Sequence, residues 1–92
     1  MAWKVELERG AKRDLDKLDP QTARRILVFL RDRVAPLDDP RSLGEALRGS
    51  TLGAFWKYRV GAWRIIADIQ DDALRVLVVR IGNRREVYRP AN

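Results

Sequence analysis

Three short strand-like segments between residues 52 and 88 constrain the fold of this chain more than any other feature. They cover Phe55–Val60, Trp63–Ile69 and Leu74–Ile81. Gly61-Ala62 and Asp71-Asp72 separate them with residues typical of tight turns. The third segment is apolar on both sides, which is typical of a central strand. The pattern predicts three consecutive strands, followed by a basic loop over Gly82–Tyr88.

The first third of the chain predicts one strand and two helices. Trp3–Leu7 alternates apolar and polar residues, as a half-buried strand does. Gly10–Leu18 carries apolar residues at helical spacing and predicts a short helix. Asp19 is a preferred N-cap and Pro20 suits the first helical turn, so we expect a second helix from Pro20 to about Val34. Its apolar stripe comprises Ala23, Ile26, Leu27, Leu30 and Val34.

Residues 35–42 contain two prolines and two aspartates, and they predict a loop. Residues 43–49 are consistent either with a helical turn or with a loop docked on the core. The whole chain, residues 1–92, therefore predicts one small α+β domain. Its elements are expected in the order strand–helix–helix–strand–strand–strand, with an antiparallel sheet and the helical hairpin packed on one face.

Alternation along the strands assigns each side chain to a face of the sheet. The side chains expected against the helices are Trp56, Tyr58, Val60, Trp63, Ile65 and Ala67. Lys57, Arg59 and Arg64 then lie on the opposite face, together with Phe55 and Ile66. Cations mixed with apolar side chains are unusual on a surface that meets only water, so the pattern suggests a face that another molecule covers.

The composition excludes several kinds of site. The chain has no histidine and no cysteine, which excludes a histidine-dependent catalytic pair or triad, a thiol nucleophile, a disulfide and a Cys/His metal site. Adjacent aspartates at 38–39 and 71–72 fall in turns, and we expect no metal and no cofactor. No apolar run approaches the roughly 20 residues of a membrane span. We therefore expect a cytoplasmic protein without a membrane partner.

Positive charge is concentrated in the strand-rich half. Residues 1–46 contain ten Lys/Arg and nine Asp/Glu, whereas residues 47–92 contain nine against four. Most of the formal charge of +6 therefore belongs to the strands and the basic loop. Such a concentration attracts nucleic acid, an anionic membrane or an acidic protein, and the alternative is a merely solubilising surface.

Five residues remain as candidates for a catalytic site, and we expect them to converge: Lys57, Arg59, Arg64, Arg84 and Tyr88. RNA can be cut without metal or histidine when a 2′-hydroxyl attacks the adjacent phosphorus, leaving a 2′,3′-cyclic phosphate and a 5′-hydroxyl. The reaction needs a base, an acid and donors for the charge that grows on the phosphoryl oxygens. Arginine matches phosphate geometry and stays charged, while lysine or tyrosine can be the base if nearby cations lower its pKa.

A structural alternative is that carboxylates neutralise the cations of the strands. Asp68 and Glu86 are the only nearby acids that the sequence suggests. Two acids are too few to neutralise the whole set, so the sequence favours a functional cluster.

The order of elements and three motifs resemble the RelE/ParE superfamily of type II toxins. The motifs are WKYRV at residues 56–60, WRII at residues 63–66 and IGNRREVY at residues 81–88. The resemblance covers nearly the whole chain, and Gly82–Tyr88 is its most specific part. It implies an antiparallel sheet flanked by helices and neutralisation by a RelB-like antitoxin in a toxin–antitoxin hetero-oligomer. The RelE branch implies cleavage of mRNA in the ribosomal A site, whereas the ParE branch poisons DNA gyrase and generally lacks the basic catalytic set.

The resemblance also implies roles for single residues. Tyr88 would be the general base and Arg84 the acid or leaving-group stabiliser. Arg64 would hold the scissile phosphate, and Lys57 and Arg59 would hold neighbouring phosphates and the transition-state charge. The roles of Tyr88 and Lys57 could be exchanged. Further cations expected to contact RNA are Arg48, Arg80, Arg85 and Arg89.

The sequence therefore predicts a ribosome-dependent, metal-independent mRNA endonuclease with the ribosome, mRNA and an antitoxin as partners. One alternative is a ParE-like inhibitor of DNA gyrase without nuclease activity. Another is an inactive binding module that serves as antitoxin partner and DNA co-repressor.

Overall fold

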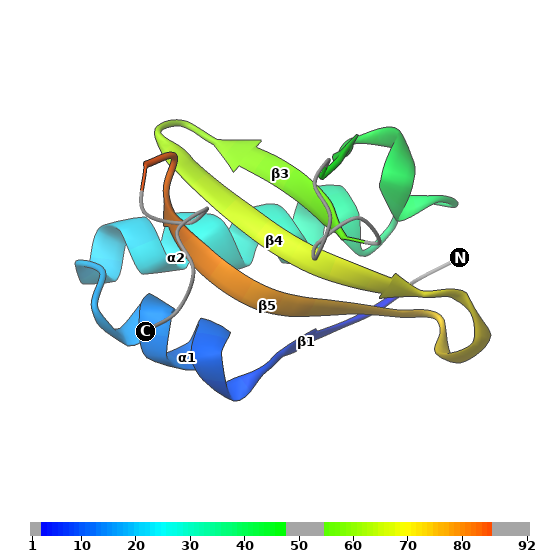
Figure 1. Ribbon diagram of the computed structural model, residues 1–92, viewed down its shortest axis with the longest axis horizontal. Coiled ribbons are helices and arrows are strands. Elements are labelled where there is room, and N and C mark those ends of the chain that lie inside the picture. Colours follow the sequence, from blue (N-terminus) through cyan, green and yellow to red (C-terminus); the bar gives the residue numbers. More distant parts are fainter. Residues whose placement is uncertain (1–2, 48–54, 86–92) are drawn as a thin grey trace.

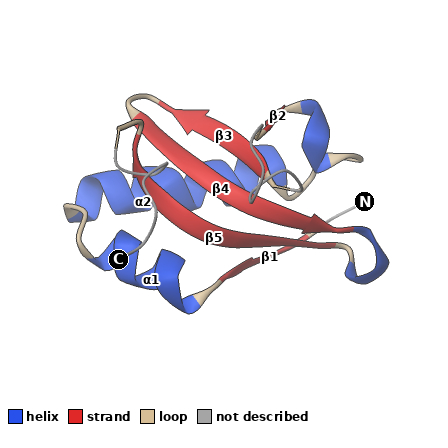
Figure 2. Cartoon of the chain, viewed as in Figure 1, coloured by secondary structure: helices blue, strands red, loops and turns tan. Residues whose placement is uncertain are grey.

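A five-stranded sheet with two helices on one side forms the framework of the chain (Figures 1 and 2). The computed structural model describes residues 3–47 and 55–85. The elements follow the order β1 (Lys4–Leu7), α1 (Arg9–Asp16), α2 (Pro20–Phe29), β2 (Glu45–Ala46), β3 (Trp56–Val60), β4 (Trp63–Gln70) and β5 (Arg75–Asn83). The α+β class and the strand–helix–helix–strands order are confirmed, with β2 as an additional strand.

The sheet is mixed rather than wholly antiparallel, which corrects one detail of the prediction. Its order is β1-β5-β4-β3-β2. β2 to β5 pair in antiparallel fashion, but β1 pairs with β5 in parallel, with Val5 opposite Val76. The two helices connect β1 to β2 at the opposite edge of the sheet. The antiparallel strands β2 to β5 then lead back across the sheet, and β5 runs beside β1 in the same direction. The predicted central position of β5 is confirmed.

The second helix begins where the capping residues predict. Asp19 accepts a hydrogen bond from the backbone N–H of Thr22 at 3.1 Å, and Pro20 occupies the first turn. Helical backbone continues to Val34, but Leu30–Val34 is a π-helical turn. The side chain of Leu27 is 43% exposed although helical spacing places it on the apolar stripe. The stripe is therefore wider than the surface that the sheet covers.

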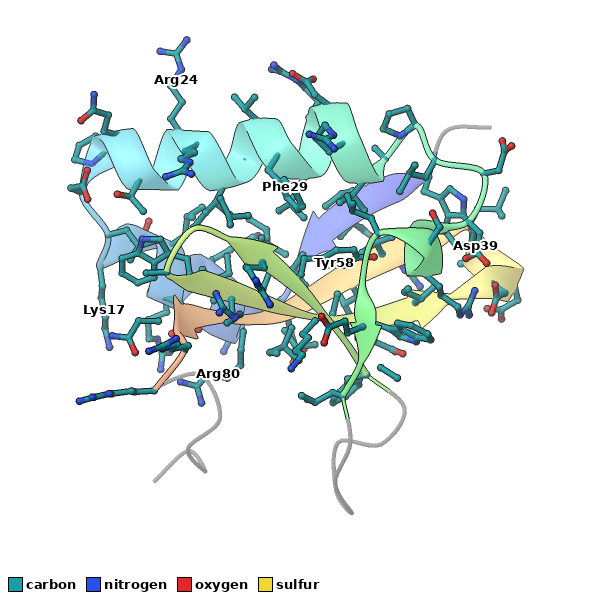
Figure 3. The ribbon with its side chains drawn as sticks, turned by 90° about the horizontal axis from the view of Figure 1, so that it is seen from above. Lys17, Arg24, Phe29, Asp39, Tyr58 and Arg80 are labelled. Carbon is teal, nitrogen blue, oxygen red and sulfur yellow. The ribbon has the colours of Figure 1, made fainter. Side chains whose placement is uncertain are left out.

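The main core lies between the sheet and the helices. Ile26 and Leu30 from the helical segment meet Ile65 and Val78 from the sheet, and all four are almost completely buried. The ring of Tyr58 points toward α2 and meets Phe29 edge to face at 6.1 Å (Figure 3). The predicted inward face of β3 and β4 is therefore confirmed.

A small second core lies on the opposite face of the sheet. Leu47 and Ile66 are 7% and 1% exposed, and Phe55 and Val79 pack against them. Leu47 follows β2 directly and donates its backbone N–H to the carbonyl of Phe55 at 2.9 Å. Within this segment Glu45–Ala46 form β2 and Leu47 packs on Ile66, so its described part docks on the core and is not a helical turn. The apolar part of this face is thus covered by the chain itself, and its cations remain at the surface.

No helix among the described residues is long and apolar enough to cross a membrane.

Candidate functional site

The β3–β4 turn brings cations from three parts of the chain to one end of the sheet. Gly61 adopts φ +61°, a conformation that glycine tolerates without strain. The turn places Arg59 directly opposite Arg64, and Arg64 lies opposite Gly82 on β5. The backbone N–H of Arg84 donates to the carbonyl of Ala62 at 3.2 Å. The end of β5 is therefore anchored to the same turn.

These residues line a pocket of about 270 Å³ on the sheet face away from the main core. Its walls are formed by Leu43, Glu45, Lys57, Tyr58, Arg59, Arg64 and Arg84. The structure thus brings together four of the five predicted catalytic residues. The fifth, Tyr88, lies outside the described residues.

Three of the four pocket cations have no carboxylate partner in residues 3–47 and 55–85. Within that part of the chain, Arg59, Arg64 and Arg84 take part in none of the ion pairs. Arg64 instead donates from Nη1 to the carbonyls of Gly61 and Trp63, both at 3.0 Å. These bonds fix the guanidinium while leaving its charge uncompensated. Like charges directly opposite on neighbouring strands repel each other, so Arg59 and Arg64 form an arrangement that a bound anion would stabilise.

Lys57 has a carboxylate neighbour that the sequence analysis missed. Its Nζ lies 3.7 Å from Oε2 of Glu45, the residue opposite it on β2. Asp68, the neighbour suggested by the sequence, accepts a hydrogen bond from Gln70 at 3.1 Å. The reason for the error is that β2 is two residues long and carries no β-branched residue, so no local signal marked it as a strand.

Tyr58 is also among the residues that line the pocket, but its ring lies in the main core. Its hydroxyl donates to the carbonyl of Pro40 at 2.7 Å. Burial, reinforced by the negative charge of Asp39, raises the pKa of Tyr58 to about 12. At neutral pH this phenol is protonated and bonded to Pro40, so it is not a candidate base.

Two of the four cations predicted to contact RNA lie within the described residues. Arg80 lies toward α1, with Nε 3.6 Å from Oδ2 of Asp14. Arg85 is exposed next to the pocket end of β5, and its backbone N–H donates to Oδ1 of Asn83 at 3.0 Å. Arg48 and Arg89 lie outside the described residues. Nothing in the described residues assigns a role to these four, and RNA contact stays a prediction.

A larger groove of about 570 Å³ lies between β1 and the α2 segment. Its apolar lining includes Val5, Leu7 and the exposed Leu27, and Arg24 and Arg31 also contribute. Arg31 pairs with Asp32 at 2.8 Å, and Arg24 points away from the sheet (Figure 3). β1 is an edge strand of the described sheet, so this groove combines apolar surface with a strand that has a neighbour on one side only within residues 3–47 and 55–85. A group of three or more His, Cys, Asp or Glu that could hold a metal ion does not occur among the described residues.

A family model for the ParE toxin of the type II toxin–antitoxin system parDE matches residues 5–88. The chain belongs to the RelE/ParE superfamily of type II toxins. Toxin RelG of Mycobacterium tuberculosis is 29% identical over 89 residues, which cover 97% of this chain and 99% of the relative.

Solved structures of RelE toxins share the fold. The toxin–antitoxin complex RelBE2 of Mycobacterium tuberculosis matches with a TM-score of 0.82 and 26% identity, over 94% of this chain and 95% of that chain. An arginine double mutant of E. coli RelE bound to a peptide of antitoxin RelBc matches with a TM-score of 0.70 and 20% identity, over 90% of this chain and 84% of that one. The predicted superfamily and RelE-like fold are therefore confirmed.

Proposed function

We propose that this toxin is a ribosome-dependent mRNA endonuclease that acts in the cytoplasm. The observation that carries the proposal is the pocket in which Lys57, Arg59, Arg64 and Arg84 converge. Three guanidinium groups without a described carboxylate partner suit a phosphodiester better than a protein surface, because arginine forks match phosphate oxygens. The likeness to RelG and to RelE structures supports the same branch of the superfamily.

The proposed reaction is attack of a 2′-oxygen on the adjacent phosphorus, with cleavage of the bond from phosphorus to the 5′-oxygen. The products are a 2′,3′-cyclic phosphate and a 5′-hydroxyl. Arg64 holds a non-bridging oxygen, because its guanidinium is oriented by two backbone carbonyls. Arg59, directly opposite, neutralises the charge that develops on the phosphoryl group. One well-placed donor of this kind is typically worth about 3–4 kcal/mol of transition-state stabilisation.

Two proton transfers complete the reaction. As the resemblance implies, we assign Tyr88 as the base that takes the proton of the 2′-hydroxyl, and Arg84 as the acid that donates a proton to the leaving 5′-oxygen to give the 5′-hydroxyl. Lys57 lies 3.7 Å from Glu45, and we assign it to a neighbouring phosphate, as the resemblance implies. This assignment favours Tyr88 over Lys57 as the base.

The decisive experiment is primer extension on mRNA from cells that express the toxin, compared with Arg64→Ala and Arg84→Ala variants. With the wild type we expect cuts in the mRNA that are in frame with its codons. With Arg64→Ala we expect at least a 100-fold loss of cleavage, the size expected for one transition-state donor. Arg33→Ala is a matched control, because Arg33 is exposed and lies outside the pocket. Unchanged cleavage by Arg64→Ala would contradict the proposal.

Inhibition of DNA gyrase is the second candidate, because the matching family model is that of ParE toxins. The same cells distinguish the two functions. Intact mRNA together with DNA breaks and an SOS response would favour the gyrase inhibitor. Absence of growth arrest without the antitoxin would favour the inactive binding module.

We propose further that the groove between β1 and α2 binds an amphipathic helix of a RelB-type antitoxin. An acidic residue on that helix would complement Arg24, which has no ion-pair partner among the described residues. Structures of relatives solved as complexes with RelB-type antitoxins support this kind of partner.

Leu27→Glu tests the groove. We expect the variant to arrest growth as the wild type does but to lose rescue by, and co-purification with, a coexpressed RelB-type antitoxin. Leu74→Glu is the matched control, because Leu74 is similarly exposed at 41% but lies in the β4–β5 turn, outside the groove. Equal co-purification of both variants would contradict the proposal.

A further inference from the structure

A cation outside the pocket lies against the same turn that organises it. A Cβ on Gly61 would lie 3.4 Å from Nη1 and 3.5 Å from Nη2 of Arg25, a residue of α2. Arg25 is exposed, and it belongs to none of the ion pairs within residues 3–47 and 55–85. The sequence analysis did not single it out, because a basic residue on a helix usually faces water.

Two guanidinium groups from distant parts of the chain therefore lie near the turn residue Gly61. That of Arg25 lies beside the position that a Cβ on Gly61 would occupy, and Nη1 of Arg64 donates to the Gly61 carbonyl at 3.0 Å. The next residue, Ala62, accepts the backbone N–H of Arg84. Positive charge thus extends from the pocket across the turn to α2. Positive charge gathered around one turn attracts an anion that contacts both sides of the turn.

We infer that Arg25 binds a second phosphate of the nucleic-acid backbone, so that RNA continues from the pocket across the β3–β4 turn toward α2. The inference rests on the proposed function for the nature of the polyanion, but it concerns binding rather than the chemical step. Arg25 does not line the pocket, and it is a binding residue and not a catalytic one. A phosphate contact outside the reacting centre stabilises ground state and transition state equally, and its loss therefore raises KM without lowering kcat.

The first test measures binding without cleavage. The probe is a fluorescein-labelled 20-nucleotide RNA with 2′-O-methyl groups, which cannot be cut by 2′-hydroxyl attack. Arg25→Gln is expected to reduce the slope of log K against log salt concentration by about 0.7, the value for one phosphate contact on a single strand. This slope corresponds to affinity about fivefold weaker at 0.1 M salt. Arg25→Lys should restore most of the slope, whereas a residue that merely packs on the turn would not show charge-dependent rescue.

Arg33→Gln is the matched control, since it removes the same charge from an exposed helical position away from the turn and should leave the slope unchanged. An unchanged slope for Arg25→Gln, an equal change for Arg33→Gln, or no binding of the probe by the wild type at 0.05 M salt would overturn the inference. Loss of antitoxin affinity with unchanged RNA binding would overturn it too, since Arg25 would then serve an acidic protein.

The second test separates this inference from the proposed function. On isolated ribosomes, Arg25→Gln should raise the KM for mRNA cleavage about fivefold with kcat unchanged, in contrast to Arg64→Ala. If the wild type binds the probe with the expected salt slope but cuts no mRNA, the proposed function fails and the inference stands. If the wild type cuts mRNA and Arg25→Gln leaves both KM and the slope unchanged, the inference fails and the proposed function stands.

Discussion

Two of the pocket-lining residues have opposite effects on the stability of the free protein. Tyr58 is 1% exposed and satisfies the carbonyl of Pro40, so it stabilises the fold. Arg59 is exposed and faces Arg64 across the strands, so its charge is unfavourable in the free protein. The pocket is therefore lined both by a residue that stabilises the core and by Arg59 and Arg64, which have no carboxylate partner within residues 3–47 and 55–85.

We expect the protein to lose stability at alkaline pH, where the buried phenol of Tyr58 ionises. Its pKa is raised from 10.0 to about 12, so its contribution is complete below pH 10 and is lost as pH rises toward 12. The loss amounts to about 2–3 kcal/mol. We expect Tyr58→Phe to be less stable at pH 7 by about 1–3 kcal/mol, because the Pro40 carbonyl loses its partner. The variant should also lack the decrease in stability that Tyr58 causes between pH 10 and 12.

Absorbance at 295 nm measures this titration directly in Tyr88→Phe, because the chain has two tyrosines and this variant retains only Tyr58. A midpoint near 10 in the folded protein would contradict the assignment.

Arg59→Gln predicts a gain in stability together with a loss of activity. Removing one member of a like-charged cross-strand pair should raise the free energy of unfolding by roughly 0.2–1 kcal/mol. Urea unfolding measures the gain, and Arg33→Gln controls for the change in net charge. Equal gains in both variants would show that repulsion within the pair is negligible.

At the scale of elements, Arg41 is one of the residues that hold the connection from the helices to β2. Arg41, in the 3₁₀ turn Pro40–Ser42, donates from Nη1 to Asp71 at 3.0 Å and to Asp39 at 3.3 Å. Its guanidinium also lies 5.9 Å from the ring centroid of Trp56. Arg41 thereby joins this connection to the β4–β5 turn and to β3. The position of Glu45 beside Lys57 depends on that connection.

Asp71→Asn predicts a pH-dependent loss of stability. Its hydrogen bond with Arg41 lowers the pKa of Asp71 from the ordinary value of 3.8. The contribution is therefore present above pH 3.8 and is lost as pH falls through the lowered value. We expect Asp71→Asn to have a lower urea midpoint than the wild type at pH 7 and pH 5, with a difference that narrows below pH 3.8. Asp72→Asn, in the same turn, should show no such difference at any pH.

Across the molecule as a whole, the two faces of the sheet are buried to different extents. α2 and α1 bury one face, whereas the second core on the other face depends on Leu47 and Phe55. The basic pocket lies beside this smaller core, at the end of the sheet nearest the β3–β4 turn. Most of the fold's stability thus resides on the face away from the site, which leaves the site free to carry unfavourable charge.

Ile65 and Ile66 are a matched pair that tests this division, because they are neighbours on β4 with 0% and 1% exposure. We expect Ile65→Ala to cost about 4–5 kcal/mol and Ile66→Ala about 2–3 kcal/mol, since the cover over Ile66 can collapse into the space and the helices over Ile65 cannot. Denaturant unfolding measures both free energies. A larger cost for Ile66→Ala would show that the second core is the more rigid one.

Local chemistry in the sequence was sufficient for much of the architecture. Asp19 and Pro20 marked the start of α2, alternation assigned Tyr58 and Ile65 to the core, and Gly61 marked the turn. Each of these signals acts over a few residues, because capping, pleat and positive φ are properties of the local backbone. The same alternation placed Lys57, Arg59 and Arg64 on one face, which is why the pocket was within reach of sequence reasoning.

The remaining features arise from contacts between residues that are far apart in the chain. The parallel pairing of β1 with β5, the strand β2 and the Glu45 neighbour of Lys57 have no local signal. The same is true of Arg25, which approaches Gly61 only because α2 crosses the sheet beside the β3–β4 turn. Alternation along each strand fixes which side chains can share a face of the sheet, because it is a local property of the backbone. Which of these side chains meets a partner, as Lys57 meets Glu45, depends on how distant segments pack.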